Sequence, residues 1–374
     1  MPAISALIKP ASGNCNMKCD YCFYRDETSK RNEKSYGIMS EETLKNVLRK
    51  IILHSEDRCT IAFQGGEPTL CGLDFFEKAV YYTKVYNKRK IQIDFALQTN
   101  GLDINERWCK FFKENHFLIG LSVDGTQKIH NQYRHQAKDN GSTYDHVLKT
   151  AEMFERMRVD FNILTVVHHE TAEKIEEIYE DYRLRKFMWQ QYISCLDPLG
   201  EKRGIRDYSL FPIEYGRFLT RLFNLWFKDL MQGKQPFIRQ FENYVGILAG
   251  YPPESCEQCG ICGTQYVIEA DGSVYPCDFY ALDHYCLGNL NVNAIVEIDA
   301  KRKEIKFIQQ SYNHPGKCKQ CKYFHICRGG CYRNRLEAGE GIEGLNYFCE
   351  GYYVFFENCY DRLSYIAKKI SKNI

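Results

Sequence analysis

Short apolar runs alternate with amphipathic stretches along the first half of the chain. The apolar runs are rich in β-branched and aromatic residues, and they predict six strands at residues 5–8, 60–64, 91–98, 117–122, 161–167 and 188–193. Between them, apolar residues recur at helical spacing in residues 41–53, 75–86, 106–114, 144–157 and 172–185, with Ser40 as a candidate N-cap of the first helix. Strands separated by helices predict parallel pairing through right-handed crossovers, and therefore an α/β fold.

The number of strand–helix units limits the architecture. Six units are too few to close an eight-stranded barrel, so we expect a partial (β/α)6 barrel of the TIM type. Residues 212–230 predict a further helix, and from about residue 233 the chain changes to short segments, turns and cysteines. We therefore predict a partial-barrel domain over residues 1–232 and a cysteine-rich domain with a C-terminal helix over residues 233–374.

The composition excludes several classes of protein. Hydrophobic residues make up 44% and charged residues 26%, and 50 basic against 48 acidic side chains give a net charge of +2. This balance favours neither nucleic acid nor an anionic membrane as a partner. No apolar run approaches the ~18 residues of a membrane span, and the N-terminus lacks the pattern of a secretory signal. We expect a cytoplasmic protein whose 18 cysteines serve mainly as metal ligands or small buried side chains rather than in disulfides.

Three cysteines near the N-terminus, Cys15, Cys19 and Cys22, have the spacing C-x3-C-x2-C, with Tyr21 in the last gap. Three thiolates bind all but one iron of a [4Fe–4S] cluster, so that one iron stays open to a reacting molecule. The alternative is a structural zinc site, whose fourth ligand would have to come from a distant residue because no histidine precedes His54. The open cluster is the favoured interpretation, and it predicts a cofactor-driven reaction.

Polar and glycine-rich turns follow the other predicted strands. In Gly65-Gly66-Glu67-Pro68 the glycines let the backbone approach a ligand, and Glu67 can receive an ammonium group. Further polar candidates at or after strand ends are Gln98, Asn100, Ser122 and Arg134. Ordinary turn chemistry and a solvated arginine are the alternatives. Because the carboxyl ends of parallel strands meet at one edge of a sheet, we expect these residues to share a binding site.

The second half carries a denser cysteine pattern. The spacing runs Cys262-x9-Gly272-x4-Cys277, then Cys318-x2-Cys321-x5-Cys327-x3-Cys331, then Cys349, with Cys256 before the first of these. Eight thiolates suffice for two fully ligated iron–sulfur clusters or for two closed zinc sites. Cys259 competes with Cys256 as a ligand.

Together these motifs resemble the radical S-adenosylmethionine (SAM) superfamily, and the second half resembles its SPASM domain, which carries two auxiliary [4Fe–4S] clusters. The likeness to the anaerobic sulfatase-maturating enzymes covers nearly the whole chain. It is carried by residues 7–12, 22–24, 62–70 and 195–198 and by the segment around Asp278. The resemblance implies SAM and three [4Fe–4S] clusters as cofactors.

The resemblance also implies roles for single residues. The open iron of the Cys15/Cys19/Cys22 cluster would bind the methionine end of SAM. The residues implied to hold SAM are Tyr21, Gly65, Gly66, Glu67, Gln98, Asn100, Ser122, Arg134 and Leu196. The first auxiliary cluster would be bound by Cys256, Cys262, Cys277 and Cys331, and the second by Cys318, Cys321, Cys327 and Cys349.

The family oxidises a cysteine or serine in a sulfatase, within a C/S-x-P-x-R type sequence, to Cα-formylglycine. By resemblance, a 5′-deoxyadenosyl radical takes one hydrogen from the target Cβ, and Asp278 removes the thiol or hydroxyl proton. Reference pKa values of about 3.9 for Asp and about 8.5 for Cys make that proton transfer uphill by roughly 6 kcal/mol. We therefore expect burial to raise the pKa of Asp278, and we expect cysteine to react faster than serine.

The expected partners are a sulfatase or another peptide in extended form and an electron donor such as flavodoxin or ferredoxin, without nucleic acid or membrane. Tyr24 and Gln64 lie beside the SAM motifs and are assigned no chemical step. Two alternatives stay open. One is another SPASM enzyme that cross-links or epimerises a peptide, for which Cys195, Cys259 or Cys286 could donate hydrogen. The other is a non-catalytic iron–sulfur electron carrier.

Overall fold

The computed structural model describes residues 4–336 and 344–371, which form two compact units. The first unit contains the described residues up to 123 together with 130–162 and 264–307. The second contains 124–129, 163–263 and the described residues from 308 on. The chain therefore passes between the units several times, and the domain boundary near residue 232 stays a prediction.

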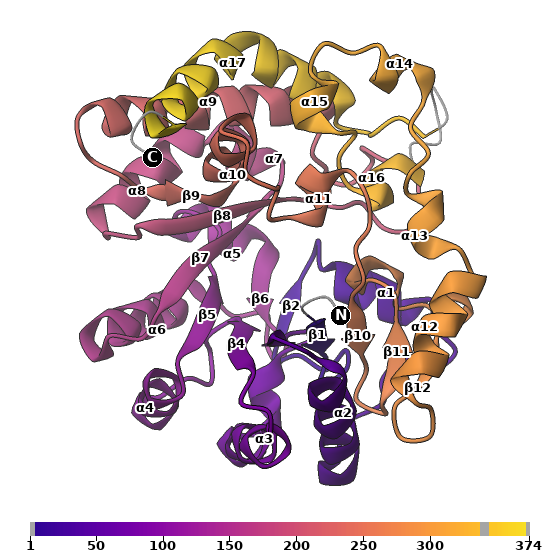
Figure 1. Cartoon of the computed structure of the whole chain (residues 1–374). Helices are drawn as coiled ribbons and strands as arrows, with labels where there is room; N and C mark the ends of the chain where they lie inside the picture. The colour runs from indigo at the N-terminus through magenta and orange to yellow at the C-terminus, as the bar shows by residue number, and fades with distance from the viewer. Residues whose placement is uncertain (1–3, 337–343, 372–374) are drawn as a thin grey trace. The chain divides into compact units, whose positions relative to one another are not determined.

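A sheet of mainly parallel strands forms the centre of the first unit (Figure 1). Its strands are β1 (Ile4–Ile8), β3 (Arg58–Phe63), β4 (Gln92–Thr99), β5 (Phe117–Ser122), β10 (Tyr266–Ile268), β11 (Ser273–Tyr275) and β12 (Gly288–Asn289). They follow one another in the order β12-β11-β10-β1-β3-β4-β5, parallel from β10 to β5 and antiparallel from β10 to β12. Ala6 of β1 lies opposite Ile61 on one side and Tyr266 on the other, so the first strand of the chain is an interior strand.

Two three-residue strands form a separate antiparallel sheet in the same unit. They are β2 (Met17–Cys19) and β6 (Arg134–Gln136), with Cys19 opposite Arg134. This small sheet ties the cysteine loop after β1 to a segment that follows β5 in the chain.

Helices and short 3-10 turns connect these strands. The helices are α1 (Phe23–Ser29), α2 (Glu41–His54), α3 (Leu73–Tyr86), α4 (Glu106–Glu114), α6 (Tyr144–Met157) and α12 (Ile295–Glu304). The 3-10 turns are η1 (Pro68–Cys71), η2 (Asp278–Tyr280) and η3 (Asp283–Tyr285). Residues of both units occur in α5 (Gln127–Tyr133), β7 (Phe161–Val167) and α13 (Phe307–Gln310).

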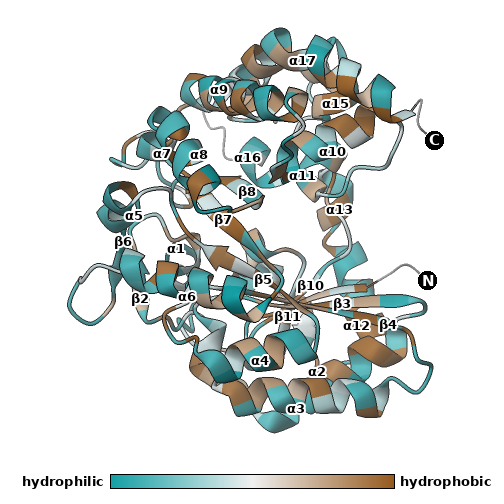
Figure 2. Ribbon diagram, turned by 90° about the vertical axis from the view of Figure 1, so that its left-hand side faces the viewer, coloured by the Kyte–Doolittle hydropathy of each residue, from teal (hydrophilic) through white to brown (hydrophobic). Residues whose placement is uncertain are grey.

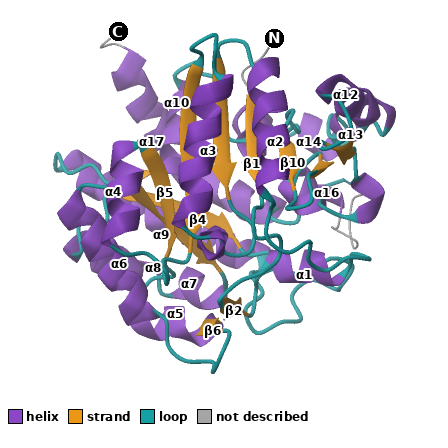
Figure 3. Ribbon diagram, turned by 90° about the horizontal axis from the view of Figure 1, so that it is seen from below, coloured by secondary structure: helices purple, strands orange, loops and turns teal. Residues whose placement is uncertain are grey.

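Helices α2, α3 and α4 lie side by side along the sheet of the first unit (Figure 3). Each carries both hydrophobic and hydrophilic residues (Figure 2), as expected for helices with one face on a sheet. The hydroxyl of Ser40 accepts a hydrogen bond from Thr43 N–H at 3.1 Å, which confirms the predicted N-cap of α2. Beneath α3, Phe63 of β3 packs edge-on against Phe76, with 5.0 Å between ring centroids.

The second unit contains parallel strands with helices beside them. Strand β8 (Trp189–Ser194) pairs in parallel with β7 and with β9 (Phe237–Ile238). Its helices are α7 (His169–Glu173), α8 (Ile175–Leu184), α9 (Pro212–Met231), α10 (Arg239–Leu248), α11 (Cys256–Cys259), α14 (Gly316–Lys319), α15 (Phe324–Cys327), α16 (Tyr332–Leu336) and α17 (Cys349–Ser371). Helices α9 and α17 pack closely (Figure 1). Their backbones approach each other at two glycines, and a Cβ on Gly216 would lie 2.5 Å from the carbonyl oxygen of Gly351.

The structure confirms the α/β class and all six predicted strands, as β1, β3, β4, β5, β7 and β8. The single helix predicted over residues 172–185 is wrong, because non-helical dihedral angles at Lys174 separate α7 from α8. Strands β2, β6 and β9–β12 were not predicted, because two or three residues are too few to establish a period. Among the described residues, no helix combines the length and apolar character that crossing a membrane requires.

Candidate active site

The loop between β1 and α1 holds the three N-terminal cysteines among hydrogen-bond donors. Met17 N–H donates to Cys15 Sγ at 3.3 Å, and the side-chain amide of Asn100 donates to the same sulfur at 3.7 Å. The guanidinium of Arg134 donates to Cys19 Sγ at 3.9 Å. Donors directed at sulfur stabilise the thiolate, which is the form that binds iron.

The three thiols are neighbours in space as well as in sequence. Burial raises the pKa of Cys15, and the charges of Glu67, Cys19 and Cys22 raise it further. Burial also raises the pKa of Cys22, which directly precedes α1. Within the described residues, no three His, Cys, Asp or Glu side chains are arranged to hold a single metal ion. Three thiols that act on one another from one loop fit three corners of an iron–sulfur cube.

The glycine turn after β3 lies directly against this loop. Gly66 N–H donates to Ser12 O at 2.9 Å, and Glu67 N–H donates to Asn14 O at 2.7 Å. A Cβ on Gly66 would lie 2.0 Å from Asn14 O, and Gly65 has a φ of +118°. Only glycine fits at either position, because any side chain would push the turn away from the cysteine loop.

The carboxylate of Glu67 fastens this turn to the end of β4. Its Oε1 accepts hydrogen bonds from Thr69 N–H at 3.0 Å, from Thr69 Oγ1 at 2.6 Å and from Thr99 Oγ1 at 2.8 Å. Its Oε2 accepts one bond, from Asn100 N–H at 2.8 Å. Burial raises the pKa of Glu67, and these hydrogen bonds oppose that rise.

The remaining residues predicted to hold SAM occupy several elements. Tyr21 is buried, lies 6.2 Å from Tyr133 between ring centroids, and has the Arg134 guanidinium 5.5 Å from its ring. Gln98 is exposed near the end of β4, and Ser122 is half-buried at the end of β5. Gln98 and Ser122 therefore lie at the carboxyl ends of their strands, whereas Tyr21 follows β2 and Arg134 begins β6 of the small sheet.

Leu196, unlike the other residues predicted to hold SAM, lies outside the first unit. It follows β8 and belongs to the second unit, where Cys195 N–H donates to Val167 O at 2.9 Å. Its predicted contact with adenine stays a prediction.

Asp278 begins the short turn η2 directly after Cys277. Its carboxylate accepts hydrogen bonds from two residues, one on α1 and one directly after β3. Tyr24 Oη donates to Asp278 Oδ2 at 2.6 Å, and Gln64 Nε2 donates to the same oxygen at 2.8 Å. Gln64 Nε2 also lies 2.8 Å from Tyr24 Oη. The second oxygen, Oδ1, is buried and has no hydrogen-bond partner among the described residues.

Burial shifts the ionisation of this carboxyl in the direction expected from the sequence. Only 9% of Asp278 is exposed, and burial raises its pKa to about 6, with Glu27 adding to the rise. The charge of Lys9 and the hydrogen bonds from Tyr24 and Gln64 act in the opposite direction. A carboxylate with one unpaired oxygen and a raised pKa is suited to accepting a proton.

Four buried charged side chains lie near Asp278: Lys9, Glu27, Arg31 and Glu269. We call them the charge quartet. Lys9 Nζ lies 3.1 Å from Glu27 Oε2 and 3.0 Å from Glu269 Oε1. Arg31 bonds the same two oxygens, at 3.0 Å and 2.6 Å. All four side chains are at most 1% exposed, so the two cations and two anions balance within the protein.

The charge quartet connects α1 to the turn that carries Asp278. Glu27 Oε1 accepts a hydrogen bond from Ala281 N–H at 2.7 Å, just after η2. Lys9 Nζ lies 4.8 Å from the centre of the Tyr24 ring. The same helix therefore carries Tyr24, which bonds Asp278, and Glu27, which holds the end of the Asp278 turn.

Seven of the eight predicted auxiliary-cluster cysteines lie in the second unit and form two sets. Burial, with smaller contributions from Cys349, Cys318 and Cys321, raises the pKa of Cys327 to about 12. Burial also raises the pKa of Cys331, to which Cys256 and Cys262 contribute. The eighth predicted ligand, Cys277, belongs to the first unit.

The competing cysteine, Cys259, has a different environment. Its thiol donates to Pro253 O at 3.7 Å, the charge of Arg328 acts on it, and it in turn raises the pKa of Cys256. The choice between Cys256 and Cys259 as ligand stays a prediction.

Sequence reasoning missed Lys9, Glu27, Arg31 and Glu269 and gave Tyr24 and Gln64 no place beside Asp278. One signal was available, because Lys9 stands within a strand-like apolar run where a solvated lysine is unusual. The other three look like ordinary surface charges until their partners from distant parts of the chain are known.

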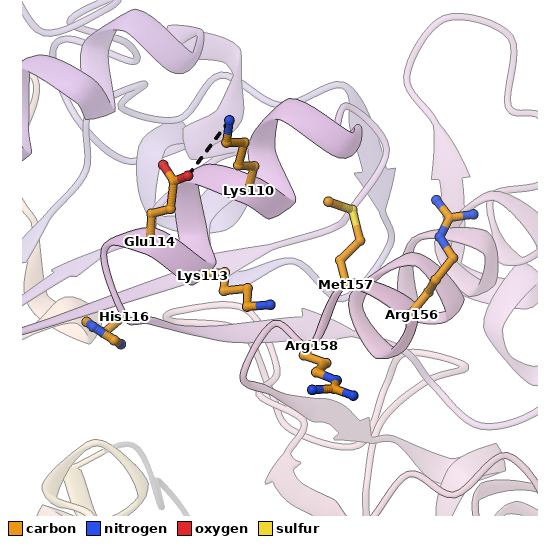
Figure 4. A pocket seen from close by; sticks show the side chains of 7 residues that line it. All are labelled: Lys110, Lys113, Glu114, His116, Arg156, Met157 and Arg158. Carbon is orange, nitrogen blue, oxygen red and sulfur yellow. Dashed lines mark ion pairs between the residues drawn. The ribbon is translucent and has the colours of Figure 1, made fainter.

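A separate cavity of the first unit, of about 670 Å³, is lined mainly by basic side chains (Figure 4). They are Lys110, Lys113, His116, Arg156 and Arg158, and Lys110 lies 3.9 Å from Glu114 in an ion pair. His116 directly precedes β5, so this cavity lies at the amino end of that strand, away from Ser122 at its carboxyl end. It is therefore not the site that the cysteine loop forms.

Comparison with protein families identifies both cysteine regions. Residues 10–182 match the radical SAM superfamily, and residues 256–322 match the SPASM family, an iron–sulfur cluster-binding domain. The chain thus contains a radical SAM domain and a SPASM domain.

Comparison with single proteins extends over the whole chain. A cysteine-type anaerobic sulfatase-maturating enzyme of Clostridium novyi is 43% identical, over 99% of each chain. A serine-type anaerobic sulfatase-maturating enzyme of Bacteroides thetaiotaomicron is 29% identical, over 97% of this chain and 91% of that protein. The structure of anSMEcpe with bound AdoMet and the Cp18Cys peptide is 42% identical, with a TM-score of 0.93 over 99% of this chain and 100% of that one.

Proposed function

Because this chain belongs to the family of anaerobic sulfatase-maturating enzymes, we propose that it oxidises a cysteine or serine side chain of a sulfatase to Cα-formylglycine. The observation that carries the proposal is the geometry at Asp278. Its Oδ2 is fixed by Tyr24 and Gln64, while the buried Oδ1 is left without a partner. The alternatives of a peptide cross-linking enzyme and an electron carrier do not account for this arrangement.

The N-terminal site is assigned to SAM. Cys15, Cys19 and Cys22 would hold a [4Fe–4S] cluster with one iron left to bind the methionine end of SAM. Gly65, Gly66 and Glu67 lie against the cysteine loop, and an ammonium finds room at Glu67 Oε2, which accepts one hydrogen bond, rather than at Oε1, which accepts three. The further contacts of SAM are assigned to Tyr21, Gln98, Asn100, Ser122, Arg134 and Leu196. SAM bound there supplies a 5′-deoxyadenosyl radical that takes one hydrogen atom from the target Cβ.

Asp278 then acts on the target's heteroatom. Its unpaired Oδ1 accepts the thiol or hydroxyl proton, while Tyr24 and Gln64 keep the carboxylate in place through Oδ2. Loss of that proton, and of one further electron that would pass to an auxiliary cluster, converts a cysteine to a thioaldehyde or a serine to an aldehyde. Water hydrolyses the thioaldehyde to the aldehyde and releases sulfide.

The SPASM cysteines are assigned to two auxiliary clusters. The first is held by Cys256, Cys262, Cys277 and Cys331, and the second by Cys318, Cys321, Cys327 and Cys349. The choice of Cys256 over Cys259 is supported by the influence of Cys256 on Cys331. A small reducing protein such as flavodoxin or ferredoxin is the proposed electron donor, and the substrate binds as an extended segment.

A paired peptide experiment tests the proposed function. The anaerobically reconstituted protein is incubated with SAM, a reductant and peptides that differ only in having cysteine, serine or alanine at the target position of a C-x-P-x-R sequence. We expect 5′-deoxyadenosine release and an aldehyde mass with the cysteine peptide, less aldehyde with serine and none with alanine. SAM cleavage with an unchanged cysteine peptide, or with a cross-linked one, would refute the proposal.

A further inference from the structure

Arg335 is a buried cation in the part of the second unit that carries the SPASM cysteines. It lies on α16, which begins directly after Cys331, and only 2% of it is exposed. Its guanidinium donates to three backbone carbonyls, those of Gly260 at 3.0 Å, Ser311 at 2.8 Å and Asn313 at 3.0 Å. These bonds satisfy most of its N–H groups without neutralising its charge.

No carboxylate balances this charge among the residues that the structure describes. Arg335 Nε has no hydrogen-bond partner there, and the nearby aromatic ring, that of Tyr332, lies 5.4 Å from the guanidinium. An arginine stays protonated in a protein, and an uncompensated buried charge is strongly unfavourable. A negative partner for Arg335 therefore has to come from outside the described side chains.

The groups that surround Arg335 identify the source of that negative charge. Burial lowers the pKa of Arg335, whereas Cys262, Cys331 and Cys318 act in the opposite direction. Cys262 is also linked to Arg335 through a single residue, because Cys262 N–H donates to Ser311 Oγ at 2.9 Å while Ser311 O accepts from Arg335.

The three cysteines come from both predicted sets. Cys262 and Cys331 belong to the first auxiliary set, and Cys318 belongs to the second. A cube held by four thiolates carries a net negative charge, and nearby positive charge is one of the factors that set its reduction potential. The residues around Arg335 thus fit a cation placed next to two anionic clusters.

We propose that Arg335 is the shared counter-ion of the two auxiliary clusters and raises the reduction potential of both. It acts by balancing charge and makes no bond to iron or to the substrate. The inference rests on the presence of the two clusters and is independent of the target that the enzyme oxidises. The competing explanation is that Arg335 only clamps the loops at residues 260 and 311–313 through their carbonyls.

Reduction potentials separate these explanations. The full-length protein with Cys15→Ala, Cys19→Ala and Cys22→Ala, reconstituted anaerobically, carries the auxiliary clusters alone, and each is titrated by electron paramagnetic resonance. In that background we compare Arg335→Gln with Arg335→Lys, which keeps the charge but not the planar fork. The matched control is Arg217→Gln, at an exposed arginine of α9 in the same unit.

We expect Arg335→Gln to shift the potentials of both clusters to more negative values, Arg335→Lys to retain most of the original potentials, and Arg217→Gln to change neither. Unchanged potentials in Arg335→Gln, or a shift of only one cluster, would overturn the proposal. If Arg335→Gln takes up less iron, the result with Arg335→Lys distinguishes charge balance from a structural clamp. Full iron content and near-original potentials with lysine support charge balance, and loss of iron with lysine as well identifies a clamp and overturns the proposal.

Discussion

The two units balance their buried positive charge in different ways. In the first unit, Lys9 and Arg31 each lie within ion-pair distance of both Glu27 and Glu269, so the charge quartet is neutral by itself. In the second unit, Arg335 is bonded to three carbonyl oxygens and, among the described residues, to no carboxylate. The first arrangement is balanced by side chains of the unit itself, whereas the described residues supply no carboxylate to balance the second.

The difference shows which unit depends on cofactors for its charge balance. The charge quartet holds the end of the Asp278 turn through Glu27 and Ala281, in addition to any anchoring by the neighbouring Cys277. The surroundings of Arg335 become electrostatically complete only with their clusters. Asp278 lies outside the quartet, and among the described residues its buried Oδ1 has no hydrogen-bond partner.

Replacing the carboxylate of Asp278 has the largest expected effect on aldehyde formation. In Asp278→Asn the proton acceptor is lost while the contacts of the cysteine loop remain, so aldehyde formation should fall by roughly 10²–10⁴-fold, the usual contribution of a general base. Release of 5′-deoxyadenosine should persist. Both products are measured in one reaction by mass spectrometry, and an unchanged aldehyde yield would remove Asp278 from the mechanism.

Breaking the charge quartet has the next largest effect. Glu269→Gln leaves two buried cations with the single carboxylate of Glu27, and removal of one partner from a buried pair costs about 3–5 kcal/mol. We expect a decrease of that size in the free energy of unfolding, measured by urea denaturation. The matched control is Glu152→Gln, an exposed glutamate of α6 in the same unit, which should change stability by less than about 0.5 kcal/mol. Equal losses in the two variants would show that the quartet is not an internally balanced group.

Loosening Asp278 without removing it gives a smaller effect. Tyr24→Phe deletes the hydrogen bond to Oδ2 but leaves that from Gln64, so we expect a loss of about 1–2 kcal/mol, or roughly tenfold in the rate of aldehyde formation. The readout is the ratio of aldehyde to 5′-deoxyadenosine, which should fall. A proportional fall in both products would instead place Tyr24 at SAM cleavage.

The smallest effect concerns a carboxylate of the second unit that lacks a balancing cation. Burial, with a smaller contribution from Glu254, raises the pKa of Glu242 to about 7, and Glu242 Oε1 is buried without a hydrogen-bond partner. The unfolded chain ionises this group near pH 4.5, so its ionisation disfavours the folded state increasingly between about pH 4.5 and 7 and constantly above.

Glu242→Gln should therefore unfold at a higher temperature than the unmodified protein at pH 8. Because the side chain is only half-buried, the gain should be on the order of 1 kcal/mol. The two proteins should differ least near pH 4.5. A stabilisation independent of pH would contradict this account of Glu242.

Much of the fold was predictable because its signals are local. Residues 117–122 and 161–167 were predicted as strands with the bounds of β5 and β7, since apolar runs of that length between turn residues leave few alternatives. The cysteine spacings and the glycine turn predicted the site for the same reason, and the direct contact of Gly66 with the cysteine loop agrees with that grouping.

The charged network was not predictable because its partners are far apart in the chain. The carboxylate of Glu27 meets the backbone of Ala281, and Arg335 meets the carbonyl of Gly260, and neither pair leaves a periodic pattern in the sequence. A charged residue is written the same way in the sequence whether it is buried or solvated. The fold determines which charged side chains are buried and therefore need a partner of opposite charge.

The position of β1 has a consequence for the synthesis of the chain. Ile4–Ile8 is synthesised long before its neighbour on one side, Tyr266–Ile268, and the Asp278 turn follows later still. At roughly 5–20 residues per second, one edge of that strand waits on the order of tens of seconds for its partner. During that time the nascent protein exposes one unpaired strand edge and lacks Asp278, so the proton transfer proposed for this carboxylate cannot begin before residue 278 has been added.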